Sequence, residues 1–229
     1  MKSFKSYLVE MATPSQHHKN VVYYHGTSTE AKAKSIFTHG LDPSETIVKY
    51  GSRNSQMKPE EGSVYITPQL QYAMIYALGG DFFGHNPNQN DIKRDGEFGY
   101  VFEISGNELV NIGPDEDAVG ELIYRAMDKS LKPNENVAAN IVLKYVKHLT
   151  DNQFKKIKDG QYSYFASGGK KINKFLSDSD KLLIIDSGSH ISHKGKLKIS
   201  KCWRFSRLDT KEIKKDGSNF FDYAKEWKP

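Results

Sequence analysis

The sequence predicts an α+β fold in which strands and helices alternate at the start of the chain and strands return near its end. Residues 21–78 read as strand, helix, strand and helix, in that order. Residues 117–176 carry apolar side chains at helical spacing, whereas residues 196–205 alternate apolar and charged side chains as a half-exposed strand does. A chain of 229 residues, 37% of them hydrophobic, is long enough to bury a core.

The first strand and helix are predicted in residues 21–40. The stretch NVVYYHG is rich in Val and Tyr, which favour a strand over residues 21–24. Residues 27–29 are Thr, Ser and Thr, which are good helix N-caps, and an apolar stripe then continues until Gly40. We therefore expect His25 to lie where a strand ends, just before a helix begins.

The second strand and helix are predicted in residues 63–78. GSVYIT has the composition of a strand, and Thr67 and Pro68 are suited to cap and open a helix. This helix is expected to turn four residues inward: Leu70, Ala73, Met74 and Ala77. Gly79 and Gly80 would end it.

The other elements are predicted from shorter signals. Strands are expected at residues 98–104, 108–112, 181–186 and 196–205, and helices at residues 117–127, 136–149 and 169–176. The apolar run KLLIID, at residues 181–186, is typical of a buried strand.

The net charge of +5 is concentrated towards the C-terminal end of the chain. Residues 194–215 contain nine Lys or Arg but only two acids, Asp209 and Glu212. Such a segment suits contact with DNA, with other nucleic acid or with an acidic partner, although a solvated basic surface would have the same composition.

Two further features limit the classes of function. Cys202 is the one cysteine, so neither an internal disulfide nor a zinc site made of cysteines is expected. His190 and His193 would face opposite sides of a strand, and we expect no metal site. No apolar run reaches the ~20 residues that cross a bilayer, so we expect no contact with a membrane.

Three candidate site features occur near the start of the chain: His25-Gly26-Thr27, Tyr65 and Tyr76. A histidine can bind a ligand hydroxyl group, a glycine lets a ligand approach the backbone, and a tyrosine ring can cover a flat or cationic ring. Taken singly, each feature also has a structural explanation. His25 could be a polar residue at a strand end whose hydrogen bonds are made within the fold, and Tyr76 could be part of the core.

Together these features resemble the ADP-ribosyltransferase superfamily, in its poly(ADP-ribose) polymerase and diphtheria-toxin-like branch. The matching motifs are YHGT, HGL at residues 39–41, GSVYIT and QYAMIYA, and the resemblance covers residues 21–112. It implies a split mixed β-sheet core with flanking helices, and NAD as the co-substrate.

The resemblance also implies a role for each matching residue. His25 would hold the 2′-hydroxyl of the nicotinamide ribose, the backbone of Gly26 would bind the nicotinamide amide, and Thr27 would contact the adenosine half. Tyr65 and Tyr76 would enclose the nicotinamide ring. Breaking the bond from ribose C1′ to nicotinamide builds oxocarbenium character, as glycoside cleavage does. The ADP-ribose would pass to a host protein or to a nucleic acid.

The catalytic glutamate of this family does not stand at its usual place. That place falls near residues 189–190, which are Ser and His, and this favours transfer of a single ADP-ribose over chain elongation. The acidic stretch PDEDAVGE offers replacements, of which Glu116 is the first choice and Glu121 the second. Capping and the helix dipole also explain acids at a helix start.

The N-terminal stretch MKSFKSYLVE resembles the capsid-targeting leaders of internal head proteins in T-even-type tailed phages. This second resemblance implies cleavage after Glu10, packaging in the virion interior, and release into the host cytoplasm as an effector that modifies host components. An amphipathic helix docked on the domain is the alternative. The predicted organisation is a leader at residues 1–20, a catalytic domain at 21–208, and a basic and aromatic tail at 209–229.

Two other functions stay open from the sequence. The tRNA 2′-phosphotransferase family shares this fold and also begins with HGT, but it has His-Leu-Ser where residues 65–67 are Tyr-Ile-Thr. That family also uses added arginines, whereas Arg53 and Arg94 lie in predicted loops. A non-catalytic internal head protein bound to DNA is the second alternative, and the absent late glutamate favours it.

Overall fold

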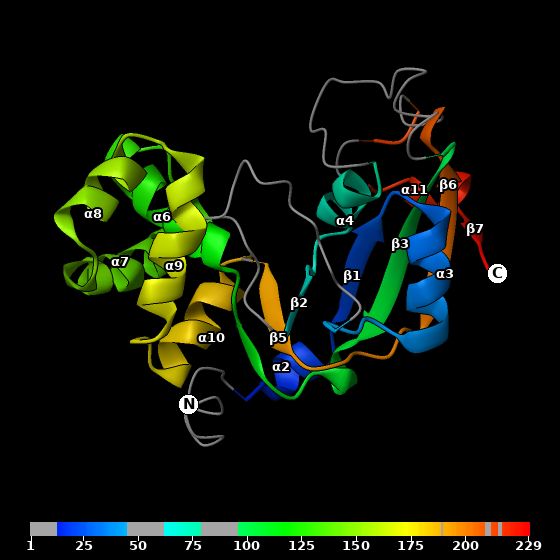
Figure 1. Cartoon of the computed structure of the whole chain (residues 1–229), viewed down its shortest axis with the longest axis horizontal. Coiled ribbons are helices and arrows are strands. Elements are labelled where there is room, and N and C mark those ends of the chain that lie inside the picture. The colour runs from blue at the N-terminus through cyan, green and yellow to red at the C-terminus, as the bar shows by residue number, and fades with distance from the viewer. Residues whose placement is uncertain (1–12, 45–61, 79–95, 189, 209–211, 215–216) are drawn as a thin grey trace. The chain divides into compact units, whose positions relative to one another are not determined.

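The chain forms two compact units in the computed structural model, and each unit has its own sheet (Figure 1). The structure describes residues 13–44, 62–78, 96–188, 190–208, 212–214 and 217–229. Unit 1 contains the described residues of 1–15, 43–65 and 110–195, and unit 2 those of 16–42, 66–109 and 196–229. The predicted mixture of helices and strands is therefore confirmed, and it is divided over two units.

Unit 2 is built on a four-stranded sheet in the order β1-β3-β6-β7. Its strands are β1 (Val22–Thr27), β3 (Phe98–Ser105), β6 (Lys201–Ser206) and β7 (Lys225–Glu226). Each neighbouring pair is antiparallel. His25 lies inside β1 opposite Phe102 rather than after the strand, because the strand continues for two residues beyond it.

Helices contact both faces of this sheet, with α3 (Glu30–His39) on one face and α4 (Leu70–Ala77) on the other. Unit 2 also contains α2 (Gln16–Lys19), η2 (Gly106–Glu108) and α11 (Phe220–Tyr223). The predicted cap of α3 is confirmed: Thr29 Oγ1 accepts from the backbone N–H of Lys32, and Gly40 ends the helix with a φ of 80°. Its Phe37 meets Trp227, whose ring also packs edge-on against Tyr100 of β3.

Helix α4 lies directly on the opposite face of the sheet, over β1 and β3. The predicted inward residues Ala73, Met74 and Ala77 are buried. A Cβ atom added at Gly26 would lie 1.8 Å from the carbonyl oxygen of Ala73, so the helix backbone occupies the space that a side chain would need. Gly26 is thus required by packing, which differs from the expectation that its bare Cα faces a ligand.

The segment predicted as a C-terminal tail is integrated in unit 2 wherever the structure describes it. β7 pairs with β6, and Phe220 and Trp227 are buried. At the other end of the chain, the described part of the predicted leader includes α2, where His18 is buried. The predicted cleavage site after Glu10 lies outside the described residues.

Unit 1 has a three-stranded sheet in the order β2-β5-β4 and a group of helices beside it. Its strands are β2 (Ser63–Ile66), β4 (Ile112–Pro114) and β5 (Ile191–Lys194). Its helices are α6 (Glu116–Asp128), η3 (Pro133–Glu135), α7 (Asn136–Tyr145), η4 (Val146–His148), α8 (Asp151–Lys158), η5 (Tyr162–Tyr164), α9 (Phe165–Asn173) and α10 (Asp178–Asp186). Residue 66 ends β2 and is where the chain enters unit 2.

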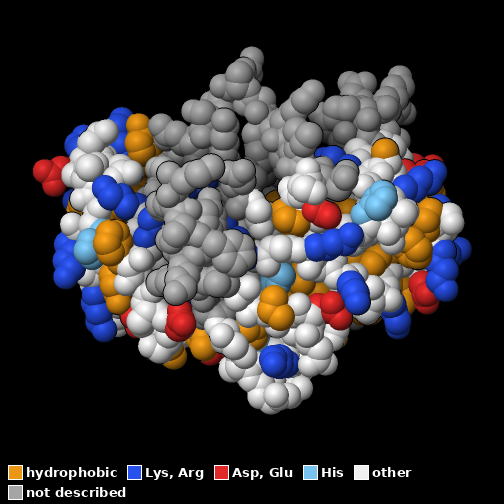
Figure 2. Space-filling model, turned by 60° about the horizontal axis from the view of Figure 1, so that its bottom comes forward, with side chains coloured by type: hydrophobic (Ala, Val, Ile, Leu, Met, Phe, Trp, Pro, Cys, Tyr) orange, Lys and Arg blue, Asp and Glu red, His pale blue; other side chains and the backbone are white. Residues whose placement is uncertain are grey.

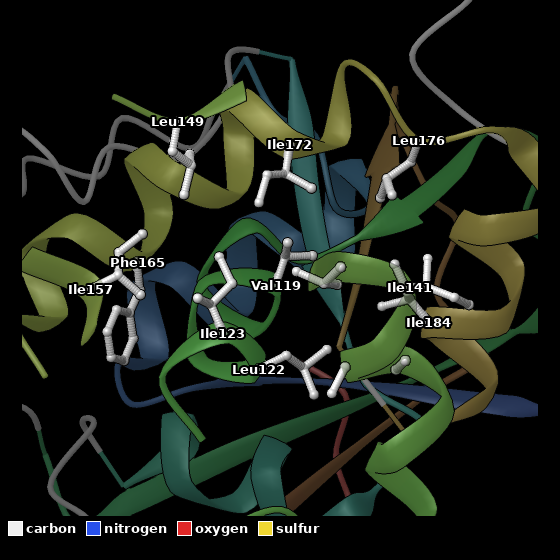
Figure 3. Close-up of a cluster of buried hydrophobic side chains, with 13 residues drawn as sticks. Val119, Leu122, Ile123, Ile141, Leu149, Ile157, Phe165, Ile172, Leu176 and Ile184 are labelled. Carbon is white, nitrogen blue, oxygen red and sulfur yellow. The ribbon is translucent and has the colours of Figure 1, made fainter. Parts of the chain in front are cut away.

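The core of unit 1 is formed by its helices, with α6 at the centre (Figure 3). Val119, Leu122 and Ile123 of α6 meet apolar side chains of α7, α8 and α9 there. A Cβ atom at Gly120 would lie 2.4 Å from the Phe165 backbone, so α6 and α9 touch through their main chains. This close contact holds α6 in position against α9.

Predicted and observed elements differ in several places, and the strand predicted at residues 196–205 begins only at Lys201. Residues 181–186 belong to helix α10 instead of a strand, because Ser177 caps a helix by accepting from the backbone N–H of Asp180. Residues 108–112 are not a strand along their length, since β4 begins only at Ile112. Helix α8 was not predicted, although the capping box of Thr150 and Gln153 marks its start.

Candidate functional site

The candidate site of unit 1 is the start of helix α6, where three acids follow strand β4. Asp115 caps the helix, with Oδ1 accepting from the backbone N–H of Asp117 at 3.0 Å. Glu116 is 3% exposed although it is the first residue of the helix. A Cβ atom at Gly169 would lie 1.9 Å from the Glu116 carbonyl oxygen, so α9 covers this first turn. The close approach of α9 therefore buries the carboxyl groups.

Tyr65 and Glu116 meet at this helix start. The Tyr65 hydroxyl donates a hydrogen bond of 2.7 Å to Glu116 Oε2, from strand β2 to helix α6. Tyr65 itself is half-buried. A hydroxyl bound to a carboxylate at this length is a strong, charge-assisted hydrogen bond. The structure thus brings together the tyrosine of the predicted strand motif and the first-choice acid.

His190 lies beside the same acids. Its backbone carbonyl accepts from the N–H of Asp115 at 2.9 Å, and its Nδ1 is 3.8 Å from Asp115 Oδ2. Burial lowers the pKa of His190 to about 4, so the imidazole is neutral at neutral pH. His190 occupies the region where the family's glutamate was expected, and it contacts the acidic stretch that was proposed as the replacement.

Two carboxyl groups at the helix start, those of Asp115 and Asp117, have raised pKa values. Burial raises the pKa of Asp115 well above its ordinary value, and the charges of Asp117 and Glu116 raise it further. Burial likewise raises the pKa of Asp117, while the nearby Lys170 ammonium lowers it. Titratable groups with shifted pKa values are concentrated at functional sites more than elsewhere.

Two buried polar atoms of unit 1 lack a hydrogen-bond partner within the part of the chain that the structure describes. They are Ser63 Oγ on β2 and Asn173 Oδ1 on α9. The amide nitrogen of Asn173 donates to the Pro114 carbonyl at 2.9 Å, which holds this side chain against the end of β4. Buried polar groups of this kind are few in native proteins, and here one lies next to the acidic stretch.

Glu121, the second-choice acid, has a different environment. Its Oε1 accepts from Arg125 Nε at 2.9 Å, and Arg125 also binds both carboxylate oxygens of Glu135. These interactions place Glu121 in an ion-pair group further along α6. The structure therefore does not bring Glu121 to Tyr65.

The predicted residues of unit 2 form a separate arrangement. Side chains alternate along a strand, so His25 and Gly26 face opposite sides of the sheet. Gly26 faces α4, so half-buried His25 lies on the other face, with Phe102. Tyr76 belongs to α4 and is 54% exposed, so it is not a core residue. His25 and Tyr76 thus belong to opposite sides of this sheet, and Thr27 is buried.

The basic C-terminal segment is partly structural. Arg207 is 1% exposed and donates to the backbone carbonyls of Leu78 and, at 3.2 Å, Gly96. Arg204 lies over the Phe98 ring and Lys201 over the Trp203 ring. Arg207 is therefore unsuited to bind phosphate groups, contrary to what the charge count suggested. Arg53 and Arg94 lie outside the described residues.

Comparison of the chain with protein-family models, with curated proteins and with solved structures gives no match. Among the helices that the structure describes, none has the length and hydropathy needed to cross a bilayer. Within the same described ranges, no three His, Cys, Asp or Glu side chains are grouped as a metal ion would require.

The sequence predicted two members of the unit 1 site and missed two others. His190 was noted as the residue that replaces a glutamate and as one of two histidines of a predicted strand, but not as part of this site, and Asn173 was not noted. Strand pairing brings His190 to Asp115, and the packing of α9 on α6 brings Asn173 to Pro114. Neither contact leaves a local pattern in the sequence.

Proposed function

We propose that this chain is an NAD-dependent ADP-ribosyltransferase, with an ADP-ribosyltransferase-like core, that uses Glu116 as its catalytic carboxylate. The hydrogen bond of 2.7 Å between Tyr65 and Glu116 carries the proposal. The sequence predicted these two residues on separate grounds, Tyr65 from the GSVYIT motif and Glu116 from the acidic stretch. Their contact over 51 positions of sequence supports a common role.

The proposed reaction breaks the bond between ribose C1′ and the nicotinamide nitrogen, and the electron pair of that bond leaves with nicotinamide. A lone pair of the acceptor forms the new bond to C1′, and the acceptor passes its proton to the Glu116 carboxylate. Positive charge develops on C1′ and on the ring oxygen before the new bond is complete. A carboxylate held at that position lowers the barrier, because electrostatic stabilisation is stronger in a buried site than in water.

The surroundings of Glu116 suit this role. The Tyr65 hydroxyl holds one carboxylate oxygen and so restricts the orientation of the group. His190 stays neutral at neutral pH and so adds no positive charge that would compete with the developing cation. The raised pKa of Asp115 keeps that carboxyl protonated to higher pH than usual, which limits repulsion between the acids.

The His25-Gly26-Thr27 segment is the second part of the proposal. We assign the ribose hydroxyl contact to His25, whose side chain is half-buried on β1. Nicotinamide stacking is assigned to Tyr65. Tyr76 lies on the opposite side of the sheet from His25 and is not needed for these two contacts.

The test is release of nicotinamide from NAD by the purified full-length chain. Glu116→Gln is expected to lower the rate by about 10²–10³-fold, the usual effect of removing one group that stabilises developing charge. Tyr65→Phe keeps the ring and removes one hydrogen bond to a carboxylate, so a loss of about 10-fold or more is expected. His25→Ala is expected to lose most of the activity as well.

Asp128→Asn is the matched control, because Asp128 is an exposed acid at the last position of the same helix. It should leave nicotinamide release unchanged. Full activity of Glu116→Gln would remove Glu116 from the mechanism, and loss with Glu121→Gln instead would assign the acid to Glu121. A wild-type chain that releases no nicotinamide, alone or with a cell lysate, would overturn the proposed activity.

The acceptor and the setting belong to the same proposal. We propose transfer to a host protein or nucleic acid by an effector that is packaged in a phage virion. Incubation with labelled NAD and a host lysate separates the two acceptors. Label on a protein survives nuclease treatment, whereas label on a nucleic acid survives protease treatment. Label in neither fraction would favour the non-catalytic alternative.

A further inference from the structure

Three aromatic side chains stack beside one another in unit 1, and we call them the aromatic column. The ring centroids of His148 and Phe175 are 3.7 Å apart with planes inclined by 6°, and Tyr145 lies 6.3 Å from His148 at 27°. They come from the end of α7, the end of η4 and the segment after α9. The column plays no part in the site at the start of α6.

One end of the column is open to solvent. His148 covers one face of Phe175, yet 48% of Phe175 is exposed. Phe175 therefore presents nearly half of its surface to solvent although one ring face is covered. An exposed flat ring held by stacking from behind is a rigid surface on which a second flat ring can stack.

Each ring of the column directly follows an exposed lysine in the chain. The three lysines are Lys144, Lys147 and Lys174. Residues 141–176 contain eight Lys but only two acids, Asp151 and Asp159, and Asp159 is paired with Lys155. At the left of Figure 2, where helices of unit 1 lie, Lys and Arg side chains surround hydrophobic ones. The segments that carry the column are therefore rich in positive charge.

Two of the three acids of the neighbouring helix α10, Asp178 and Asp180, have polar partners, and the third, Asp186, is the last residue of that helix. Asp180 accepts from the Tyr145 hydroxyl at 2.7 Å and from Ser177, and the charge of Lys144 helps to lower its pKa. Asp178 is paired with Lys181 at 3.4 Å. These acids leave the positive charge around Phe175 largely in place.

We propose that the aromatic column and its three lysines bind a single strand of nucleic acid. A base stacks on the open face of Phe175, and phosphate groups lie beside Lys144, Lys147 and Lys174. Single strands offer unpaired base faces together with regularly spaced phosphates, whereas the base faces of a duplex are already covered. An acidic peptide would match the lysines but would leave the open ring face unused. Single-stranded nucleic acid therefore matches both features.

The test is fluorescence anisotropy of labelled oligo(dT) and oligo(U), with a duplex of equal length as comparison and no NAD present. Phe175→Leu keeps an apolar side chain and loses the flat ring, so single-strand binding should weaken roughly 5- to 150-fold. Phe175→Trp should retain binding. Duplex binding should change little in either variant.

The lysines are tested through the dependence of binding on salt. Replacing Lys144, Lys147 and Lys174 by Ser should reduce the slope of log K against log salt by about 2, because three phosphate contacts are lost. The matched control replaces Lys198, Lys225 and Lys228, three lysines of unit 2, and removes the same charge. The control triple variant should keep the wild-type slope.

Four outcomes would overturn the binding proposal: no binding by the wild type, wild-type affinity in Phe175→Leu, an equal loss of duplex binding in that variant, or the same slope change in both triple variants. Circular dichroism and urea unfolding verify that each variant is folded. Because NAD is absent, failure here leaves the proposed transferase reaction untouched, and loss of nicotinamide release leaves the binding result untouched.

Discussion

Both units bury charged or titratable side chains, but they surround them differently. In unit 2, the guanidinium of Arg207 donates to two backbone carbonyls, those of Leu78 and Gly96. In unit 1, Asp115 and Glu116 are buried next to Tyr65 and His190, and burial and mutual repulsion raise the pKa of Asp115. A charged side chain that donates only to backbone carbonyls, such as Arg207, connects segments of the fold. A group of titratable side chains with shifted pKa values is instead typical of a functional site.

The largest effect on stability is expected from unit 2. Arg207→Met should lower the free energy of unfolding by about 3–6 kcal/mol, because the carbonyl groups of Leu78 and Gly96 lose a charged donor and each such hydrogen bond contributes about 1.5–3 kcal/mol. Urea unfolding measures the change. Glu116→Gln, in unit 1, should change stability far less than Arg207→Met. Equal losses in the two variants would remove the distinction between the units.

A second large effect is expected where α4 lies on the sheet of unit 2. Gly26→Ala places a Cβ atom 1.8 Å from the Ala73 carbonyl oxygen, so the helix must move. Overpacking of this kind costs about 1–3 kcal/mol, and the upper end is expected because the obstacle is backbone. Thermal unfolding measures the loss of stability. Gly62→Ala is the comparison: nothing lies within 4 Å of that position, so a loss there comes from the strain of the positive φ alone. An unchanged melting temperature in Gly26→Ala would contradict the described contact.

The pH dependence of stability should reveal the buried imidazole of unit 1. His190 has a pKa of about 4 in the folded chain and about 6.5 when unfolded, so the unfolded chain takes up the proton first as the pH falls. This residue therefore removes stability between pH 6.5 and 4, by at most roughly 3 kcal/mol. His190→Gln should flatten this part of the curve, measured by urea unfolding at pH 7 and pH 4.5. An unchanged curve would mean that His190 titrates normally.

Asp115 should make the stability depend on pH in the opposite sense to His190. Its pKa is raised in the folded chain, so its contribution is complete below the unfolded value and is lost as the pH rises through the folded value. Asp115→Asn keeps a neutral group at this position, and its stability should no longer fall over that range. A variant that is equally sensitive to rising pH would assign the effect to another group.

An effect of similar size to that of Gly26→Ala is expected for the hydrogen bond that joins Tyr65 to Glu116. Tyr65→Phe should lower the free energy of unfolding by about 1.5–3 kcal/mol, the range for hydrogen bonds to charged groups. The double variant with Glu116→Gln measures the coupling. If the two single effects simply add, the hydrogen bond contributes nothing and the assignment of Glu116 weakens.

The fold was predictable wherever local chemistry is decisive. The Thr29 cap and Gly40 stop define α3, and a composition rich in Val and Tyr favoured the strand β1. The run KLLIID was misread because a short apolar run fits a buried strand and a buried helix face equally well, and the Ser177 cap before it decided for the helix. The division into two units could not be read from the sequence, since it depends on contacts between distant segments.

The candidate site was predictable in part for the same reason. Tyr65 and Glu116 were expected from motif and composition, and the structure joins them. The place of His190 beside Asp115 depends on the pairing around β4 and β5, and the burial of the acids depends on Gly169 of α9. The packing that makes Gly26 necessary was also invisible, because a glycine required by a helix and a glycine required by a ligand look alike in a sequence.

The C-terminal Trp227 has a consequence for how the chain is made. Its ring packs against Phe37 and Tyr100, and the last strand, β7, pairs with β6. The sheet begins with β1 at residue 22 and ends with β7 at residues 225–226, so unit 2 cannot complete its sheet until β7 has left the ribosome. A stop codon placed before β7 should therefore yield a product prone to degradation in the cell.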